Sequence, residues 1–302
     1  MAILIKNKIP AELWNQKMIH MPIVLVDSYK KFLEHYKIMN IALSTENRKG
    51  AIGGSGFEET LQHFALRYGV SVCRVESLII DPDQAFNSIS DDFLNTFSEG
   101  KVSILDAPCG TGAAGISIIS TIAALRQSEL LPKLPLNIMI TAGDYSETAL
   151  HIYDQMVNDL IMYLKPVGID VSFSKAIWNA KHPDTTAALV DKWFETSQDA
   201  DEFLSIIANF SGESTKSFSE FQRSFEHIHE RLYDKKASVV WIEPQMSSAK
   251  KYFQRIAQLM EKAKNWFSKN NKNKLDYTYH WYHPFQKRKL KCNIMVQKYI
   301  RN

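Results

Sequence analysis

From residue 102 onward, short apolar runs rich in β-branched residues alternate with longer segments whose apolar residues recur every three or four positions. The first pattern is typical of buried strands and the second of amphipathic helices. Their alternation predicts a parallel sheet with helices on both faces. The predicted strands are 102–106, 137–142, 171–178, 203–209, 238–243, 277–283 and 293–299. The predicted helices are 113–126, 147–163, 185–195, 217–232 and 248–267.

The last two predicted strands are joined only by the short link 284–291. Parallel neighbours need a crossover of a dozen or more residues, so these two strands are expected to form an antiparallel hairpin. The predicted fold class is therefore α/β, with a seven-stranded, mostly parallel sheet, helices on both faces and a C-terminal antiparallel β-hairpin.

Residues 1–98 follow a different pattern, with helical stretches at 11–18, 26–36 and 58–68. The glycine-rich link 50–56 is interpreted as a flexible loop, because no clear strand precedes it. We therefore expect an N-terminal helical extension, residues 1–98, before an α/β domain, residues 99–302. The extension is expected to cap the ligand site or to shape part of it.

The composition is that of an ordinary soluble globular protein, with 45% hydrophobic and 23% charged residues. The three cysteines are far apart and lack metal-ligand spacing, which predicts neither disulfides nor a zinc site and favours a reducing, cytoplasmic location. No apolar run approaches the roughly 20 residues needed to cross a bilayer, so no membrane association is expected.

The strongest chemical signal is a glycine-rich turn between the first predicted strand and the first helix of the α/β domain. Gly110, Gly112 and Gly115 would let the backbone turn tightly and approach a ligand, and the helix N-terminus offers free N–H groups. The turn predicts a nucleotide-type cofactor. Its glycines also fit the G-x-G-x-x-G spacing of dinucleotide-binding folds, so an NAD-type oxidoreductase is an alternative.

Asp106, at the end of the strand before this turn, bears on that choice. A carboxylate there would repel a pyrophosphate and attract an ammonium or sulfonium group. It favours S-adenosylmethionine over NAD. The alternative is that Asp106 only caps the turn.

The segment Leu105-Asp-Ala-Pro-Cys-Gly-Thr-Gly112 resembles the first motif of class I S-adenosylmethionine-dependent methyltransferases. The resemblance extends over residues 102–302, because the strand count and the terminal hairpin also match that family. It implies a Rossmann-like fold, an enzyme that transfers a methyl group, and S-adenosylmethionine as the cofactor. It further implies that the methionine part of the cofactor contacts Asp106, Ala107, Gly110 and Gly112.

The ends of the next strands extend the predicted cofactor site. Asp144 is similar to the family's ribose-binding acid, and Tyr145 after it is expected to pack on the adenine, with Ser146 as the N-cap of the next helix. Asn179 stands where the family often has an acid that receives the adenine amino group, although it fits a plain loop asparagine equally well. Asn209, after the fourth strand, completes the predicted cofactor contacts.

Phe210 and Glu243 are the candidate acceptor-binding residues at the ends of the fourth and fifth strands. Glu243 is positioned to orient or deprotonate an acceptor, the alternative being a carboxylate bonded to backbone N–H groups. The Asn-Pro-Pro-Tyr type of motif and a Pro-Cys dipeptide are absent there, which disfavours DNA amino- and cytosine-C5-methyltransferases. No base or nucleophile stands out, so no catalytic residue is assigned. A non-catalytic subunit of this fold that binds nucleic acid or a partner protein is the other alternative.

Nine basic residues and one acid lie between Lys262 and Lys291, interleaved with aromatic residues. Such a composition suits phosphates and unstacked bases. Lys287, Arg288 and Lys289 follow the sixth strand and are expected at the cofactor edge, with His283 beside them. They predict a polyanionic acceptor, RNA first and an acidic protein surface second. The alternative is that charge keeps a hairpin tip soluble. No metal site is predicted from His280 and His283.

Overall fold

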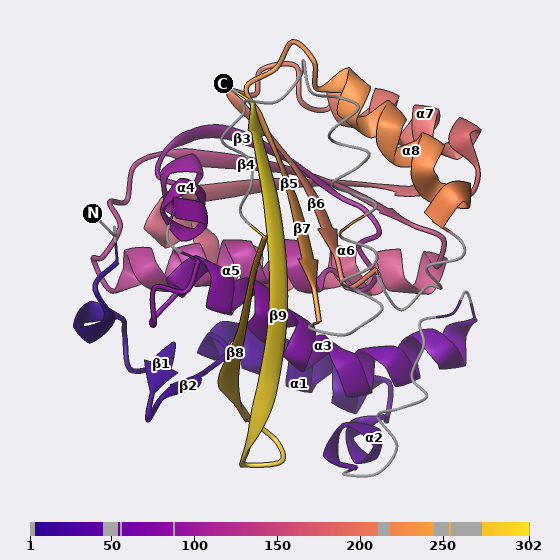
Figure 1. Ribbon diagram of the computed structural model, residues 1–302. Coiled ribbons are helices and arrows are strands. Elements are labelled where there is room, and N and C mark those ends of the chain that lie inside the picture. Colours follow the sequence, from indigo (N-terminus) through magenta and orange to yellow (C-terminus); the bar gives the residue numbers. More distant parts are fainter. Residues whose placement is uncertain are drawn as a thin grey trace.

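A single mixed sheet, flanked by helices, organises the computed structural model, which describes residues 4–44, 54, 56–86, 88–210, 218–244, 254 and 274–301 (Figure 1). The strands are β1 (Trp14–Asn15), β2 (Met18–Ile19), β3 (Gly100–Asp106), β4 (Leu136–Asp144), β5 (Ile169–Ile177), β6 (Glu202–Ala208), β7 (Ala237–Glu243), β8 (Lys274–His283) and β9 (Arg288–Arg301). The helices are α1 (Ile23–His35), α2 (Met39–Leu43), α3 (Phe57–Ile80), α4 (Ser88–Thr96), α5 (Ala113–Gln127), α6 (Glu147–Leu164), α7 (Pro183–Glu195) and α8 (Phe218–Arg231), with short 3-10 turns η1 (Lys6–Lys8) and η3 (Lys165–Val167).

The strand order is β1-β2-β8-β9-β7-β6-β3-β4-β5. The five strands from β7 to β5 are parallel, whereas β9 is antiparallel to both β7 and β8. This confirms the predicted α/β class, the mostly parallel sheet and the terminal hairpin. The central strands β3, β6 and β7 are almost continuously buried, which explains their unbroken apolar runs.

The predicted strand count of seven is wrong, because the described residues contain nine strands. The first of the two additional strands, β1, and the first residue of the second, β2, lie in segment 11–18, for which a helix was predicted. Gln16 and Lys17 have positive φ angles of 49° and 59°, which turn the chain back on itself instead of continuing a helix. Ile19 then pairs with Trp281 and adds this small hairpin to the edge of the sheet. Tertiary strand pairing therefore overrides the local spacing of apolar residues.

Helices cover both faces of the sheet, as predicted, and each helix layer packs against its own apolar cluster. Residues of α1, α3, α5 and α6 join one cluster, and those of α7 and α8 join the other. Figure 1 shows α7 and α8 apart from the layer of α1, α3 and α5. Along β3, Ile104 belongs to the first cluster and Leu105 to the second, as alternation in a strand requires.

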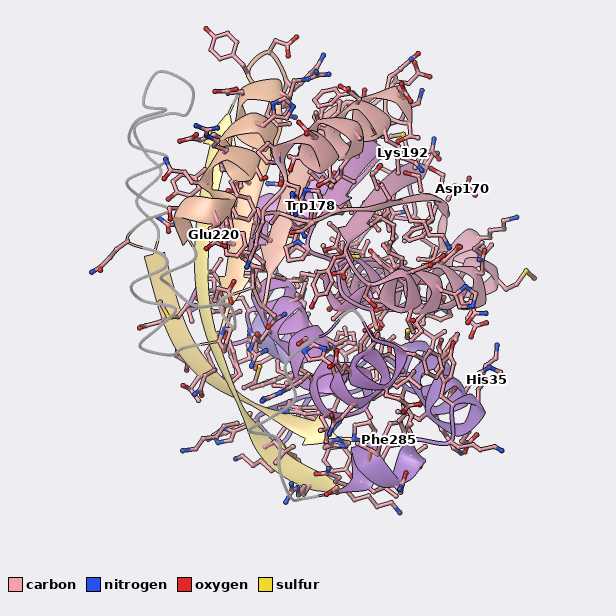
Figure 2. The ribbon with its side chains drawn as sticks, turned by 90° about the vertical axis from the view of Figure 1, so that its right-hand side faces the viewer. His35, Asp170, Trp178, Lys192, Glu220 and Phe285 are labelled. Carbon is pink, nitrogen blue, oxygen red and sulfur yellow. The ribbon has the colours of Figure 1, made fainter. Side chains whose placement is uncertain are left out.

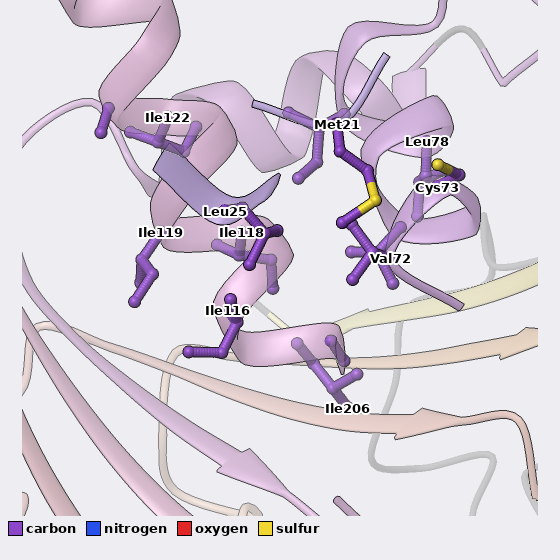
Figure 3. Packing of buried hydrophobic residues seen from close by; sticks show 14 of the residues in the cluster. Met21, Leu25, Val72, Cys73, Leu78, Ile116, Ile118, Ile119, Ile122 and Ile206 are labelled. Carbon is purple, nitrogen blue, oxygen red and sulfur yellow. The ribbon is translucent and has the colours of Figure 1, made fainter. Parts of the chain in front are cut away.

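Helix α3 lies within the first layer, where Val72 packs among the isoleucines of α5 and Ile206 of β6 (Figure 3). Burying one such side chain contributes about 1.5 to 3 kcal/mol. Ser117 of α5 also donates a hydrogen bond to the Val72 carbonyl across 3.1 Å. The N-terminal extension and the sheet therefore share one apolar cluster.

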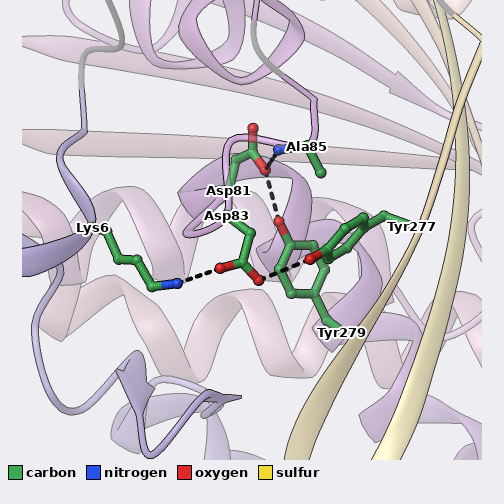
Figure 4. Close-up of polar contacts among 6 residues, drawn as sticks. All are labelled: Lys6, Asp81, Asp83, Ala85, Tyr277 and Tyr279. Atoms are coloured by element: carbon green, nitrogen blue, oxygen red, sulfur yellow. Dashed lines mark hydrogen bonds and ion pairs between the residues drawn. The ribbon is translucent and has the colours of Figure 1, made fainter.

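The C-terminal end of α3 is fastened to the β8–β9 hairpin (Figure 4). The carboxylate of Asp81 accepts hydrogen bonds from the N–H of Ala85 at 2.8 Å and from the hydroxyl of Tyr279 at 2.7 Å. Asp83 accepts one from Tyr277 at 3.2 Å and forms an ion pair with Lys6. These contacts hold the C-terminal end of α3 against strand β8.

The other predicted helices agree with the structure to within a few residues, except that 58–68 is only the first half of α3. All of the predicted helix 248–267 except residue 254, and most of the glycine-rich link 50–56, lie outside the described residues. Within the described ranges, no helix is both long enough and apolar enough to cross a membrane.

Candidate functional site

Asp106 occupies the carboxyl end of β3, where the sheet meets the glycine-rich turn. Its side chain is fully buried, and Oδ2 accepts hydrogen bonds from the N–H of Gly115 and the hydroxyl of Tyr153, each at 3.1 Å. Oδ1 is also buried and has no hydrogen-bond partner among the described residues. Burial raises the pKa of Asp106 to about 7, against the opposing effect of its hydrogen bonds. A buried carboxylate with one unpartnered oxygen would be stabilised by a cationic ligand group.

The three glycines of the turn differ in what surrounds them. A Cβ at Gly112 would lie 2.1 Å from the ring of Tyr153, and a Cβ at Gly115 would lie 1.8 Å from its hydroxyl. A Cβ at Gly110, where φ is +52°, would meet no described atom within 4 Å. Gly112 and Gly115 therefore make room for Tyr153, whereas Gly110 borders open space.

Ala107 lies between Asp106 and the turn and is 1% exposed. It packs in the cluster formed with α7 and α8, and its N–H donates to the carbonyl of Ile206 across 3.2 Å. The residue joins the turn to β6.

Asp144 stands at the carboxyl end of β4, beside the same turn. Its Oδ2 accepts a hydrogen bond from the N–H of Gly110 at 2.8 Å, and its Oδ1 accepts one from the N–H of Ser146 at 2.9 Å. Burial raises the pKa of Asp144, and the hydrogen bonds oppose this. Each carboxylate oxygen retains acceptor capacity. Asp144 thus joins β4 to the turn and offers acceptors at the edge of the sheet.

Two neighbours of Asp144 match their expected placement. The side chain of Ser146 accepts a hydrogen bond from the N–H of Ala149 at 3.2 Å, which confirms the predicted N-cap of α6. Tyr145 is 43% exposed and lies at the same edge. The predicted stacking of Tyr145 on an adenine remains a prediction.

Asn179 follows β5 and is held within its own loop. Its side-chain oxygen accepts a hydrogen bond from the N–H of Lys181 at 3.0 Å, and its backbone N–H and carbonyl both bond to the hydroxyl of Thr185. These are the contacts of a loop asparagine, the alternative considered for this residue.

Helix α3 contacts this edge at two places. The hydroxyls of Thr60 and Ser146 are 2.8 Å apart near the end of β4, and Nη1 of Arg74 donates to Oδ1 of Asn209 across 2.6 Å after β6. Between these contacts Tyr68 is buried, and its hydroxyl has no hydrogen-bond partner among the described residues. Burial raises the pKa of Tyr68, and the charges of Tyr29 and Asp106 raise it further. The helix therefore lines one side of the candidate site.

Sequence reasoning missed Thr60, Tyr68 and Arg74. Nothing local in the sequence indicates that this helix reaches the ends of β4 and β6.

The chain just after β6 bonds to the side chain at the end of β7. The N–H of Phe210 donates to Oε1 of Glu243 across 2.8 Å, and Glu243 is fully buried. The Phe210 ring packs edge-on against Phe221 and Phe225, with centroids 5.0 and 5.7 Å away. Glu243 thus supports the backbone after β6, as in the alternative considered for it, and the ring of Phe210 contacts α8.

The basic hairpin tip lies on the predicted side of the sheet but extends far beyond it. Arg288 comes seven residues before Met295, the partner of Glu243 at the end of β7, so the tip projects about 23 Å past that end. Lys287 and Lys289 are exposed, whereas Nε of Arg288 donates to the side chain of Gln286 at 2.8 Å.

His283 is buried at the base of this tip, and its Nδ1 accepts from the N–H groups of Phe285 and Gln286, each at 3.3 Å. Gln286 in turn donates to the carbonyl of Ala42, within α2, at 2.7 Å. Figure 2 shows Phe285 at this end of the molecule, well away from Trp178. Through the two bonds at Nδ1, His283 holds the turn of the hairpin.

Among the described residues, no three His, Cys, Asp or Glu side chains gather in a way that could hold a metal ion. Cys73, Cys109 and Cys292 are buried and unpaired by disulfides. Comparison of the chain with protein-family models and with curated proteins found no match.

Proposed function

We propose that the protein is an S-adenosylmethionine-dependent methyltransferase with a Rossmann-like fold. The observation that carries the proposal is the pair Asp106 and Asp144 at adjacent strand ends, both beside the open turn at Gly110. The unpartnered Oδ1 of Asp106 fits an ammonium or sulfonium group, and Asp144 fits ribose hydroxyls. The parallel sheet with its terminal hairpin supports the same family, because an NAD-type fold does not imply the hairpin.

The turn at Gly110 also suits the cofactor. Gly110 has space where a Cβ would otherwise stand, so a ligand can approach the backbone of the turn. When bound, S-adenosylmethionine supplies an activated methyl group. The chain binds it through the turn and the two acids, holds an acceptor in line with the methyl group and excludes water, which together lower the barrier by several kcal/mol.

The acceptor proposed first is RNA and the second is an acidic protein surface. The exposure of Lys287 and Lys289, on a hairpin that passes the ligand edge of the sheet, favours a polyanion there. We expect the protein to act in the cytoplasm, where its three thiols would stay reduced.

A calorimetric titration of the full chain with S-adenosylmethionine, S-adenosylhomocysteine and NAD tests the cofactor. We expect saturable binding of the first two and none of NAD. Tight NAD binding without binding of the other two would reject the proposal in favour of an oxidoreductase. Binding of S-adenosylmethionine without transfer of a labelled methyl group to RNA, protein or small-molecule pools would favour the non-catalytic alternative.

A further inference from the structure

Tyr68 of α3 has a ring that is held firmly in the apolar core and a hydroxyl that is not. The ring centroid is 4.9 Å from that of Tyr29 and 4.9 Å from that of Phe64, one helical turn earlier. Tyr68 is 2% exposed, and its hydroxyl has no hydrogen-bond partner among the described residues. A buried hydroxyl that gives up its bonds to water and gains none destabilises a fold. Phe64 packs in the same cluster without a hydroxyl, so packing alone does not explain why position 68 carries one.

The position of Tyr68 along α3 places it near the end of β3. Thr60 contacts the chain after β4, and Arg74 contacts the chain after β6. In the sheet β3 lies between β4 and β6, and on the helix Tyr68 lies between residues 60 and 74. The middle of α3 therefore crosses the part of the sheet edge where Asp106 ends β3.

Asp106 has an unpartnered oxygen of its own in this place. Its Oδ2 is occupied by the hydroxyl of Tyr153 and the N–H of Gly115, whereas its buried Oδ1 has no partner among the described residues. Burial raises the pKa of Tyr68, and the charges of Tyr29 and Asp106 raise it further, which agrees with the closeness of the two side chains. Tyr68 therefore keeps its proton near neutral pH. Two buried oxygens, one from the N-terminal extension and one from the sheet, thus lack hydrogen bonds in the same region.

We propose that Tyr68 is a cofactor-binding residue, whose hydroxyl oxygen and Oδ1 of Asp106 both accept hydrogen bonds from the ammonium group of S-adenosylmethionine. The inference deepens the proposed methyltransferase function and rests on it. An ammonium group has three N–H donors, so it can satisfy both oxygens at once. The sulfonium group has no N–H and cannot bond to the hydroxyl. A positive charge at this position also compensates the buried carboxylate of Asp106. The cofactor would then join α3 to β3, and the N-terminal extension would supply part of its site.

Calorimetric titration of the full chain with S-adenosylmethionine, S-adenosylhomocysteine and 5′-methylthioadenosine tests this contact in the wild type and in Tyr68→Phe. The first two ligands carry the ammonium group, whereas 5′-methylthioadenosine lacks the whole amino-acid part. We expect Tyr68→Phe to bind the first two about tenfold more weakly, a loss of roughly 1.4 kcal/mol, because a hydrogen bond to a charged group is removed. It should bind 5′-methylthioadenosine like the wild type.

Urea denaturation of the ligand-free proteins distinguishes a ligand contact from a structural role. Because Tyr68→Phe removes a hydroxyl that has no partner, its free energy of unfolding should equal or exceed that of the wild type. Tyr163→Phe is the matched control, because Tyr163 packs against the same cluster but lies at the C-terminal end of α6, away from the end of β4. It should bind all three ligands like the wild type.

Wild-type affinity for S-adenosylhomocysteine in Tyr68→Phe would overturn the inference. So would equal weakening for all three ligands, which would indicate a distorted site, or weakening for S-adenosylmethionine alone, which would place the hydroxyl beside the sulfonium group. A Tyr68→Phe variant clearly less stable than the wild type would show that the hydroxyl serves the fold, and would also overturn it.

The same titrations separate this inference from the proposed function. A wild type that binds neither S-adenosylmethionine nor S-adenosylhomocysteine rejects the cofactor assignment and, with it, the role of Tyr68. If the wild type binds both and Tyr68→Phe binds them equally well, the cofactor assignment stands and only the role of Tyr68 is rejected.

Discussion

The backbone N–H of Gly110 donates a hydrogen bond to Oδ2 of Asp144 across 2.8 Å, and this bond joins the glycine-rich turn to the end of the neighbouring strand. Two parts of the candidate cofactor site, 34 residues apart in the chain, are thereby held in one geometry. A change at either residue is expected to affect ligand binding through the other.

Replacing Asp144 with alanine should weaken binding of S-adenosylhomocysteine about tenfold or more. The change removes acceptors for ribose hydroxyls, a loss of about 1.5 to 3 kcal/mol, and frees the turn. Calorimetric titration measures the effect. Asp154→Ala is the control, since Asp154 lies on α6 in a partly exposed ion pair with Lys175. An unchanged Kd for S-adenosylhomocysteine in a folded Asp144→Ala variant would show that Asp144 does not contact the cofactor.

Gly110→Ala should mainly lose cofactor affinity, whereas Gly112→Ala should mainly lose stability. Both residues have positive φ, so each substitution costs about 1 to 2 kcal/mol in backbone strain. Gly112→Ala should be more destabilised, because its Cβ would lie 2.1 Å from the ring of Tyr153. Gly110→Ala should stay closer to the wild type in stability but lose cofactor affinity.

Chemical denaturation and calorimetry of the two variants check this contrast. A Gly110→Ala protein that folds and binds S-adenosylhomocysteine normally would show that the ligand does not approach this backbone.

Asp106→Asn should change how stability depends on pH. Burial raises the pKa of Asp106 to about 7 in the folded protein, against an ordinary value of 3.8 for this side chain. The folded state therefore binds more protons than the unfolded state between about pH 4 and pH 7, and the free energy of unfolding falls as pH rises through that window. An asparagine lacks this titration and keeps an oxygen for Gly115 and Tyr153.

The free energy of unfolding of Asp106→Asn, relative to the wild type, should thus increase by about 1 to 3 kcal/mol from pH 5 to pH 8 in the ligand-free protein. Urea denaturation at the two pH values measures it. A difference that does not change with pH would show that Asp106 is already ionised at pH 5.

Changing Lys287, Arg288 and Lys289 to glutamine tests the predicted RNA contact of the hairpin tip. If all three bind phosphates, the slope of log K against log salt should fall by roughly 2 to 3 units, without a change in cofactor affinity. RNA binding measured against salt gives the slope. Lys235→Gln with Lys236→Gln, just before β7 at the opposite edge of the sheet, is the control. Superimposable salt curves for the wild type and the tip variant would show that the tip does not bind RNA and that its charges only keep it soluble.

The sequence by itself determined the parallel sheet, its terminal hairpin and the position of the glycine-rich turn. These follow from local patterns, because a strand buried on both faces must be apolar and a tight turn with positive φ requires glycine. Asp106 and Asp144 could be identified for the same reason, since Asp106 ends a predicted strand and Asp144 comes two residues after the next one.

Only the tertiary structure decided which glycine faces open space. Gly110 and Gly112 look alike in the sequence, but the ring of Tyr153, from α6, fills the space beside Gly112 and not the space beside Gly110. The tertiary structure also decided that the segment 11–18 forms an edge hairpin, because Ile19 pairs with Trp281, far along the chain.

The largest contribution of the tertiary structure is the placement of α3. The periodicity of α3 predicts a helix but does not predict which elements the helix packs against. Arg74, for example, bonds to Asn209, which lies 135 residues away in the sequence. That contact depends on how α3 packs against α5 and is fastened to the hairpin through Asp81 and Tyr279. Packing between distant segments is a property of the whole apolar core, so no local pattern contained it.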